Sequence, residues 1–434
     1  MKSEQRRISV SPAQFKVRET NISTGPHDGG RSSQLKNYRL FLLILLTALL
    51  WSSSPPSAHA AETIAQDWNV ADIGIGTKPA FDFGENDQIH IMGMTETTVN
   101  GAVWYASATN LAGPWNIENV SAGYFYGPGD IIVDPTGTVH ISWHNHNLQS
   151  PNHLMIDSGG NRTHINIPTP MWHDGWDSAF ALDSNGRLYM SANNPSTFGA
   201  PNGLEYGEFD GTTWSFIDEV PGSGSFMYGL ATSIGIDSQF GPHIAYCRAI
   251  DFTMPGDLYY ATNPGGTGWL HTNVTNANGL RGRFPSLVLD DSDEPRIAWL
   301  DIDELDNTRA TVRYGFRFIT LWQDEFVDLL DNIELSFNGA RKSVSLALDS
   351  QGVPHIAYAS KRVVKYAKKP GAAWQITTVL ESDTDLYKGL AVLKLDSNDN
   401  PTIVFWQDLA SEPGLVRLIQ FNPPQTGVDS WEMY

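Results

Sequence analysis

Short hydrophobic runs alternate with polar turns along this chain, and one such phrase recurs at a nearly constant spacing. Each copy has an apolar stretch, an Asp-centred turn and a second apolar stretch, as in IGIDSQFGPHIAY and LALDSQGVPHIAY. The seven turns are 50, 49, 54, 53, 59 and 47 residues apart and begin at Gly84, Asp134, Asp183, Asp237, Asp290, Asp349 and Asp396. A period of this size is typical of a repeat architecture.

Within each copy, apolar and polar residues alternate with a period of two, which predicts β-strands. The turns, such as DSQG and DPTG, combine an Asp that accepts backbone hydrogen bonds with a Gly or Asn suited to positive φ, so each predicts a hairpin. A third run follows, and a fourth is led by Trp115, Trp214, Trp269, Trp322 or Trp374. Four antiparallel strands repeated seven times predict an all-β fold, a seven-bladed β-propeller.

The ends of the repeat region predict that the ring is closed by the N-terminal strand. Residues 66–73, QDWNVADI, read as a fourth strand without the first three, and the last unit ends in an abbreviated fourth strand, SWEMY. We expect the N-terminal strand to complete the last blade and cover its open edge. An open β-solenoid is the competing architecture, but units of 47 to 59 residues are long for one coil.

The first 60 residues are typical of a secretory signal peptide with a long basic n-region. Eight Lys and Arg residues precede the 12-residue apolar run LFLLILLTALLW, and SSSPPSAHA follows it. That order predicts cleavage near Ala60/Ala61 and a secreted or periplasmic protein. The run is shorter than the roughly 20 residues of a membrane-spanning helix, so we expect no stable membrane insertion. The alternative to a cleaved signal peptide is an uncleaved N-terminal anchor. A start codon assigned too far upstream would explain the long basic region.

Residues 61–434 then form a single propeller domain with a strongly acidic balance. Without residues 1–60 the chain keeps 28 − 8 = 20 basic and 48 − 3 = 45 acidic residues, a net charge near −25. Such a surface disfavours nucleic acid as a partner. Cys247 is the only cysteine, so no internal disulfide can form. We predict a monomer with no metal motif and no cofactor, and leave open a structural cation such as calcium in the central channel.

Repeated residues are assigned to the scaffold. The turn Asp residues are predicted to cap hairpins, and His90, His140, His243 and His355 occupy one equivalent position in four copies, so we expect buried, hydrogen-bonded side chains. Metal ligands must converge on one ion, which equivalent positions in different blades do not do. Loops that join second to third strands, or one blade to the next, share the opposite face of a propeller. We expect the functional site there.

Residues that depart from the repeat fall on this loop-rich face. The second unit contains SWHNHNLQSPNHLM, with His144, Asn145, His146 and His153, and the third begins with MWHDGWDS, with Trp172 and His173. The later units contribute Tyr228, Arg248, Arg281, Arg283, Arg341, Lys342, Tyr387 and Lys388. Six of the 20 basic residues outside the first 60 would therefore lie around one rim, which predicts an anionic ligand.

Guanidinium, imidazole and phenol groups together suit a lyase that acts on uronic-acid polysaccharides. Arg neutralises the sugar carboxylate and acidifies the neighbouring C–H, while His or Tyr removes that proton and protonates the leaving oxygen. Here the chain resembles the secreted propeller lyases of the ulvan lyase type, related to BNR-repeat proteins. The resemblance rests on DPTGTVHISWHNHN, where His146 matches a catalytic His, and on Tyr228 and Arg248. The family has a second His before the first strand of the blade that carries His146, and in this chain that position is replaced by the residues near Tyr126 and Gly127.

The resemblance implies that the chain binds an acidic polysaccharide and cleaves it by β-elimination. His146 and Tyr228 would serve as base and acid, and Arg248 and Arg283 would neutralise the carboxylate. His144, Trp172 and His173 would position the sugar. The remaining predicted substrate-binding residues are Arg281, Arg341, Tyr387 and Lys388.

Two other functions remain open. A sialidase-like hydrolase could use Arg248, Arg283 and Arg341 to hold a carboxylate, with Tyr387 or Tyr228 as nucleophile, but these turns lack the closing Trp of sialidase Asp-boxes. A non-catalytic lectin-like or protein-binding propeller is the second. Lectin propellers usually keep equivalent ligand residues in every blade, whereas here the polar residues differ between blades. Fold alone does not decide between catalysis and binding.

Overall fold

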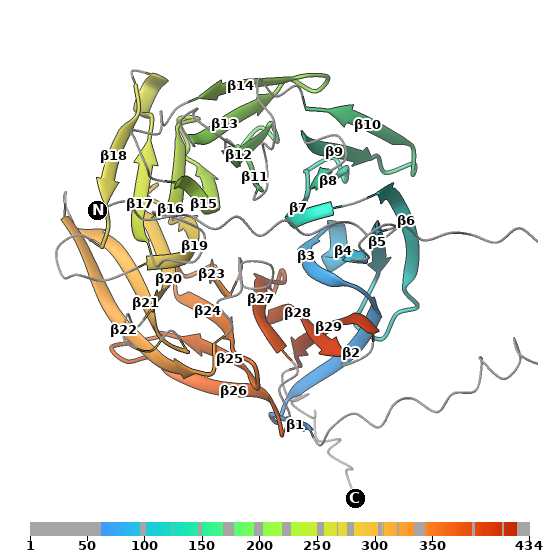
Figure 1. Ribbon diagram of the computed structural model, residues 1–434, viewed down its shortest axis with the longest axis vertical. Coiled ribbons are helices and arrows are strands. Elements are labelled where there is room, and N and C mark those ends of the chain that lie inside the picture. Colours follow the sequence, from blue (N-terminus) through green and yellow to red (C-terminus); the bar gives the residue numbers. More distant parts are fainter. Residues whose placement is uncertain are drawn as a thin grey trace, which may run out of the picture. The chain divides into compact units, whose positions relative to one another are not determined.

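The computed structural model divides the chain into Met1–His59 and Ala60–Tyr434. It describes residues 62–95, 101–123, 125–145, 150–167, 178–194, 203–218, 227–249, 256–266, 268–275, 282–302, 306, 308–318, 321–333, 343–383, 387–409 and 412–422. In these ranges it forms seven antiparallel sheets arranged around a central channel (Figure 1), which confirms the predicted seven-bladed β-propeller.

Blades 1 to 4 each contain four strands in chain order, from the channel outward. Blade 1 is β3 (Thr77–Phe83), β4 (Ile89–Thr95), β5 (Gly101–Ala108) and β6 (Asn116–Gly123); blade 2 is β7 (Phe125–Val133), β8 (Val139–Asn145), β9 (Ser150–Ile156) and β10 (Arg162–Asn166). Blade 3 is β11 (Ser178–Leu182), β12 (Leu188–Asn194), β13 (Gly203–Phe209) and β14 (Trp214–Asp218); blade 4 is β15 (Met227–Ile236), β16 (Pro242–Ala249), β17 (Asp257–Thr262) and β18 (Leu270–Asn273).

Blades 5 to 7 complete the ring, and two short 3-10 helices, η1 (Glu85–Asp87) and η2 (Pro264–Gly266), lie in turns. Blade 5 is β19 (Gly282–Leu289), β20 (Pro295–Ile302), β21 (Arg309–Phe318) and β22 (Leu321–Asp331); blade 6 is β23 (Val344–Leu348), β24 (Pro354–Ala359), β25 (Val363–Lys368) and β26 (Gln375–Ser382). Blade 7 is β27 (Tyr387–Leu395), β28 (Pro401–Leu409) and β29 (Glu412–Phe421), with β2 (Trp68–Ile75) as its outer strand.

The pairing of β2 with β29, from Trp68 opposite Phe421 to Ile75 opposite Leu415, confirms that the N-terminal strand closes the ring. The structure adds a strand that the sequence analysis did not predict. β1 (Glu62–Ile64) pairs with β26 as a fifth strand of blade 6. The predicted strand SWEMY lies outside the described residues. One short segment therefore completes the edges of two blades.

Arg417 ties β1 to blade 7. Its guanidinium donates to the Glu62 carboxylate at 2.8 and 2.9 Å, to Asp72 Oδ1 at 2.9 Å and to Gln407 Oε1 at 3.1 Å. The Arg417 and Glu62 side chains are only 5% and 9% exposed. Burying such a pair is costly unless its hydrogen bonds are made, so this network holds the two ends of the propeller in one arrangement.

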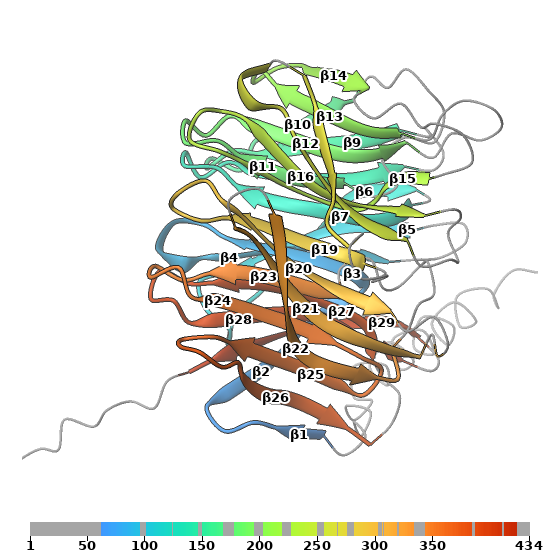
Figure 2. The same ribbon diagram turned by 90° about the vertical axis from the view of Figure 1, so that its left-hand side faces the viewer.

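The Asp-centred turns are as predicted. In Asp237, for example, Oδ1 accepts the N–H groups of Gln239 and Gly241 at 2.9 and 2.6 Å, and the turns of blades 2 to 7 repeat the same i+2 and i+4 pattern. Figure 2 shows these hairpins on one side of the disc, which we call the hairpin face. The opposite side, where second strands lead to third strands, is the loop face.

The four repeated histidines are buried, as predicted, with exposures of 3 to 7%. In blade 4, His243 Nε2 lies 3.2 Å from Asp237 Oδ2, and Nδ1 accepts the Tyr260 hydroxyl at 2.6 Å. Blade 6 repeats this chain with Asp349, His355 and Tyr366. Burial lowers the pKa of each of the four histidines from its ordinary value. They are neutral parts of the scaffold near neutral pH.

Neighbouring blades are joined by apolar clusters and by two sets of hydrogen bonds. Around the channel, Ser233 and Ser286 accept N–H groups of the next blade's first strand, from Leu287 and Leu346, at 2.9 Å. On the hairpin face, three turn serines each bond a carboxylate of the next turn, in the pairs Ser238–Asp293, Ser350–Asp399 and Ser397–Asp87. These contacts fix the positions of the strand ends from which the loop face is built.

Candidate functional site

His144 lies at the loop-face end of β8, turned toward blade 3. Ser142 and His144 are alternate residues of β8 and so share one face of the blade. That face is turned toward blade 3, because the Ser142 hydroxyl lies 3.1 Å from the hydroxyl of Ser178 on β11. His144 is 1% exposed. Tyr126 stands opposite it in the β7–β8 register. His146 follows two residues later and lies outside the described residues.

Arg248 lies at the equivalent end of β16 in blade 4. Its Nη1 donates to the Tyr259 hydroxyl at 2.6 Å, and its guanidinium carbon is 5.3 Å from the centroid of that ring. Tyr246, on the same face of β16, packs in the cluster shared with Tyr206 of blade 3. Arg248 is therefore turned toward blade 3 from the opposite side to His144.

The strand register brings Tyr228 to the same end of blade 4. Met227 pairs with Ala249 and Leu230 with Cys247, so position 228 lies on β15 beside the β16 end that carries Arg248. The structure describes the backbone of Tyr228 but not its side chain. The two positions are 20 residues apart in sequence, and pairing of neighbouring strands makes them adjacent.

Arg283 begins the loop-face end of β19, but its side chain is 5% exposed rather than displayed on the rim. A bulge follows it, with a register shift between Arg283 and Ser286 and a positive φ of 56° at Phe284. Burial raises the pKa of the Cys247 thiol to about 11, and Arg283 opposes this rise while Asp257 adds to it. Arg283 thus lies close enough to Cys247, at the blade 4–blade 5 boundary, to favour the charged form of the thiol.

The other predicted site residues are only partly covered by the structure. Tyr387 and Lys388 begin β27, and their side chains are not described. Trp172, His173, Arg281, Arg341 and Lys342 lie outside the described residues. Their roles stay predictions.

His153 was expected on the loop face, and that expectation is wrong. It is 0% exposed, accepts the Trp214 Nε1–H at 3.2 Å and lies 3.0 Å from His140 Nδ1 through Nε2. Burial, with the nearby His140, holds its pKa well below the ordinary value. Strand β9 starts earlier than the sequence suggested, which carries His153 past the loop and into the core.

Sequence reasoning also missed Tyr259, the partner of Arg248. The segment LYYATNP contains two adjacent tyrosines, and strand alternation places them on opposite faces of blade 4. Tyr259 stands opposite Tyr246 in the register and so shares the face of Arg248. Its presence beside Arg248 could have been inferred once the strand register was known.

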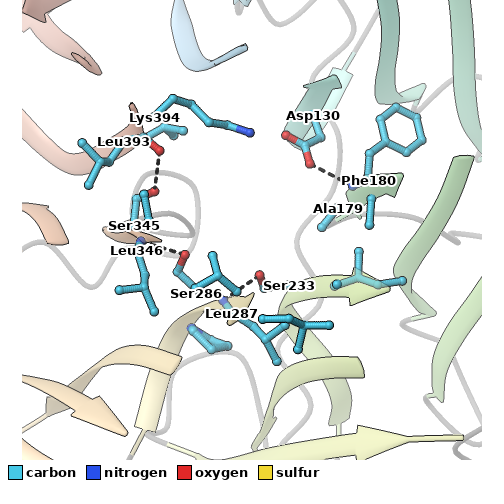
Figure 3. A pocket seen from close by; sticks show the side chains of 18 of the residues that line it. Asp130, Ala179, Phe180, Ser233, Ser286, Leu287, Ser345, Leu346, Leu393 and Lys394 are labelled. Atoms are coloured by element: carbon cyan, nitrogen blue, oxygen red, sulfur yellow. Dashed lines mark hydrogen bonds between the residues drawn. The ribbon is translucent and has the colours of Figure 1, made fainter. Parts of the chain in front are cut away.

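The central channel holds a charged cluster that the sequence analysis did not identify. Lys394 Nζ lies 3.2 Å from Asp82 Oδ1, and Figure 3 shows the Lys394 and Asp130 side chains extending toward each other in a cavity of about 570 Å³. Desolvation lowers the pKa of Lys394, but the Asp82 and Asp130 carboxylates outweigh it, so the pKa is raised overall. The Lys394 ammonium group of blade 7 therefore balances the Asp82 and Asp130 carboxylates of blades 1 and 2.

Within the described ranges, no three His, Cys, Asp or Glu side chains gather as a set of metal ligands. The same part of the chain contains no helix long and apolar enough to cross a membrane. The chemistry that the described loop-face residues offer is that of imidazole, phenol and guanidinium groups around blade 3.

No protein-family model and no protein of curated function matches this sequence. In structure, the chain is similar to the polysaccharide lyase Uly1, with a TM-score of 0.53 and 9% identity over 85% of this chain and 94% of that one. It is also similar to a PL25 ulvan lyase bound to GlcA(1-4)Rha3S, with a TM-score of 0.56 and 14% identity over 80% and 94% of the two chains.

An α-L-arabinanase from Penicillium chrysogenum, complexed with arabinobiose, gives a TM-score of 0.47 and 9% identity over 84% of this chain and 97% of that one. At 9% and 14% identity, the two polysaccharide lyase structures show the fold alone. The resemblance to propellers of the ulvan lyase type is confirmed at that level.

Proposed function

We propose that this chain is an exported carbohydrate-active propeller that cleaves a uronic-acid polysaccharide by β-elimination on its loop face. One observation carries the proposal. The β15–β16 register places position 228 beside Arg248, whose guanidinium is fixed by the Tyr259 hydroxyl at 2.6 Å. A phenol beside an oriented guanidinium is a suitable pair for a sugar carboxylate and the proton next to it.

The chemical step needs a base, an acid and a group that stabilises negative charge. The base removes the proton at C5, the electrons of that C–H bond form the C4–C5 double bond, and the C4–O bond breaks. The leaving oxygen takes a proton from the acid, so no water is consumed. In this proposal His146 and Tyr228 supply base and acid, and Arg248 binds the carboxylate whose charge grows in the transition state.

Blade 3 is the proposed floor of the substrate groove. His144 faces blade 3 from blade 2 and Arg248 faces it from blade 4. Arg248 would contact a polysaccharide lying over blade 3, and His144, which is 1% exposed, would act from beneath it. Trp172 and His173, in the segment leading into β11, would then contact the sugar, and Arg283 would contribute positive charge from within the blade 4–blade 5 boundary. Arg281, Arg341, Tyr387 and Lys388 would hold neighbouring acidic sugars.

The test is to incubate the purified protein with a panel of uronic-acid polysaccharides and follow the ultraviolet absorbance of unsaturated products. Arg248→Ala and His146→Ala should abolish turnover without lowering the melting temperature by more than the matched control Arg309→Ala, whose side chain is 43% exposed at the start of β21. New reducing ends without unsaturated product would indicate a hydrolase. Binding to an acidic glycan without any product would indicate a lectin-like protein.

Export is part of the same proposal. The basic region, apolar run and small-residue segment before Glu62 support it. Expression of the full chain in a secreting bacterial host should yield a protein whose N-terminal residue is Ala61. Retention of the first 60 residues on a membrane-bound product would contradict cleavage and favour an anchor.

A further inference from the structure

The Asp–His–Tyr chain of the scaffold is interrupted in blade 5. In blades 4 and 6 the third-strand tyrosine donates its hydroxyl to the second-strand histidine at 2.6 Å. In blade 4, Tyr260 lies opposite Ala245, and in blade 5, Tyr314 lies opposite Ala298, so the two tyrosines are equivalent. His243 and Arg296 each precede that Ala by two residues, so Arg296 occupies the histidine position of blade 5. Blade 5 keeps the Asp and the Tyr of the chain seen in blades 4 and 6 and changes only the residue between them.

Arg296 does not replace the missing contact. Its Nε and Nη2 both donate to Asp290 Oδ2, at 3.1 and 2.5 Å, and its guanidinium lies 5.8 Å from the Phe316 ring. Among the residues that the structure describes, none forms a hydrogen bond with the Tyr314 hydroxyl. Tyr314 is 7% exposed and borders a cavity, so its hydroxyl can bond to water there or to a ligand from outside the chain.

Tyr314 lines a cavity of about 640 Å³ between blades 5 and 6 on the hairpin face. Across the cavity, Lys369 Nζ donates to both oxygens of Glu325 at 2.6 Å. Trp374 Nε1 also donates to Glu325 Oε2, at 3.2 Å. The side chains of Lys369, Glu325 and Arg296 are 20%, 30% and 24% exposed, so a ligand in the cavity can reach each of them. The volume falls in the range of about 300 to 1,000 Å³ found for small-molecule sites.

The charges of this cavity define the class of ligand. Its lining includes four carboxylates and two cations, which are Asp290, Asp291, Glu325 and Asp349, and Arg296 and Lys369. The net charge of the lining is therefore −2, which disfavours the acidic sugars proposed for the loop face. A sugar hydroxyl can donate to a carboxylate and accept from a phenol or ammonium group at once. The partly buried Phe316 offers apolar surface for the C–H face of a sugar ring.

We infer that the blade 5–blade 6 cavity is a second saccharide site, which binds a neutral sugar residue through the Tyr314 hydroxyl, Glu325 and Lys369. It lies on the hairpin face, at the opposite ends of the strands from Arg248. The inference does not depend on catalysis at the loop face. A polysaccharide with both neutral and acidic sugars would be bound at two separate places on one propeller.

The experiment is saturation-transfer NMR of the full chain with the methyl glycosides of rhamnose, xylose, galactose and glucose. We expect at least one of them to bind. Tyr314→Phe, which removes only the hydroxyl, should weaken that binding by about fivefold or more, the effect of one hydrogen bond of about 1 kcal/mol. Arg296→His rebuilds the Asp–His–Tyr chain of blades 4 and 6, so it should fold normally and also reduce binding.

Two controls make the outcome decisive. Tyr366→Phe makes the same change at the equivalent position of blade 6, where the hydroxyl is bonded to His355, and should leave sugar binding unchanged. Arg248→Ala alters only the loop face and should also leave it unchanged. The inference is overturned if none of the four glycosides binds, if Tyr314→Phe and Arg296→His bind as the unaltered protein does, or if Arg248→Ala alone removes the signal.

Discussion

Replacing Arg417 by Met should destabilise the propeller more than any single exposed ion pair could. Met keeps the length of the side chain and its contact with Phe405, over which the guanidinium now lies at 5.7 Å. It removes four donated hydrogen bonds, two to Glu62 of β1 and one each to Asp72 and Gln407 of blade 7. The change therefore tests the polar network at the ring closure and not the packing around it.

The size of the effect follows from burial. Removing one member of a buried ion pair costs about 3 to 5 kcal/mol, because the partner charge stays away from water. Glu62 is 9% exposed and falls in this class, whereas Asp72 is 44% exposed and should contribute less than about 1 kcal/mol. β1 is only three residues long, so it can detach and let Glu62 reach water. We therefore expect a loss near the lower limit, about 3 kcal/mol.

Urea unfolding at pH 7 gives the free energy, and hydrogen exchange locates the loss. The Ala65 amide, which donates to Val379 O at 2.9 Å beside β1, should exchange much faster in the variant, while core amides of β24 should change only with global stability. The matched control is Arg309→Met, because the Arg309–Asp331 pair is exposed at 43% and 60% and should be worth less than about 0.5 kcal/mol. Equal losses in the two variants would refute the reasoning.

Three further predictions concern the scaffold. Burial lowers the pKa of five histidines, His90, His140, His153, His243 and His355. As the pH falls, these histidines bind protons in the unfolded chain before they do so in the folded one, so the stability of the fold should decrease below about pH 6.5. Melting curves at pH 7.5 and 5.5 test this, and an equal melting temperature at both would contradict it. Ser350→Ala removes the turn-to-turn bond with Asp399 and should cost about 1 kcal/mol by urea unfolding, whereas Ser184→Ala, at the same turn position, should cost less. Gly93→Ala places a Cβ 2.3 Å from the Trp104 ring and should cost about 1 to 3 kcal/mol in the same assay; a loss below 0.5 kcal/mol would show that Trp104 can move aside.

Period-two alternation and the spacing of the turns were sufficient to predict the architecture, because both depend on local chemistry. An Asp at the start of each turn binds its own backbone at i+2 and i+4, and that contact needs no other part of the fold. The role of His355 as scaffold followed from repetition, and the structure confirms it with Asp349 and Tyr366 as partners. The repeated phrase thus encodes hairpins, and seven hairpins in series encode the ring.

The candidate site was less accessible to sequence reasoning, because its contacts cross strands and blades. Tyr228 and Arg248 are neighbours only through the β15–β16 register, and Tyr259 joins them only because β17 aligns with β16. His153 looked like a loop residue, yet a shift of the strand start moves it into the core beside Trp214. Small shifts in register reverse which face a side chain occupies, and sequence patterns locate strand ends poorly.

The sequence by itself determined the number of blades, their strand order and the closure of the ring by residues near Trp68, because alternation and turn chemistry act within one repeat. Tertiary structure alone decided the contacts between repeats. It placed β1 on blade 6, held it through Arg417, set Lys394 beside Asp82 in the channel and left Tyr314 at the edge of a cavity. Each of these depends on the packing of one blade against another, which no local pattern specifies.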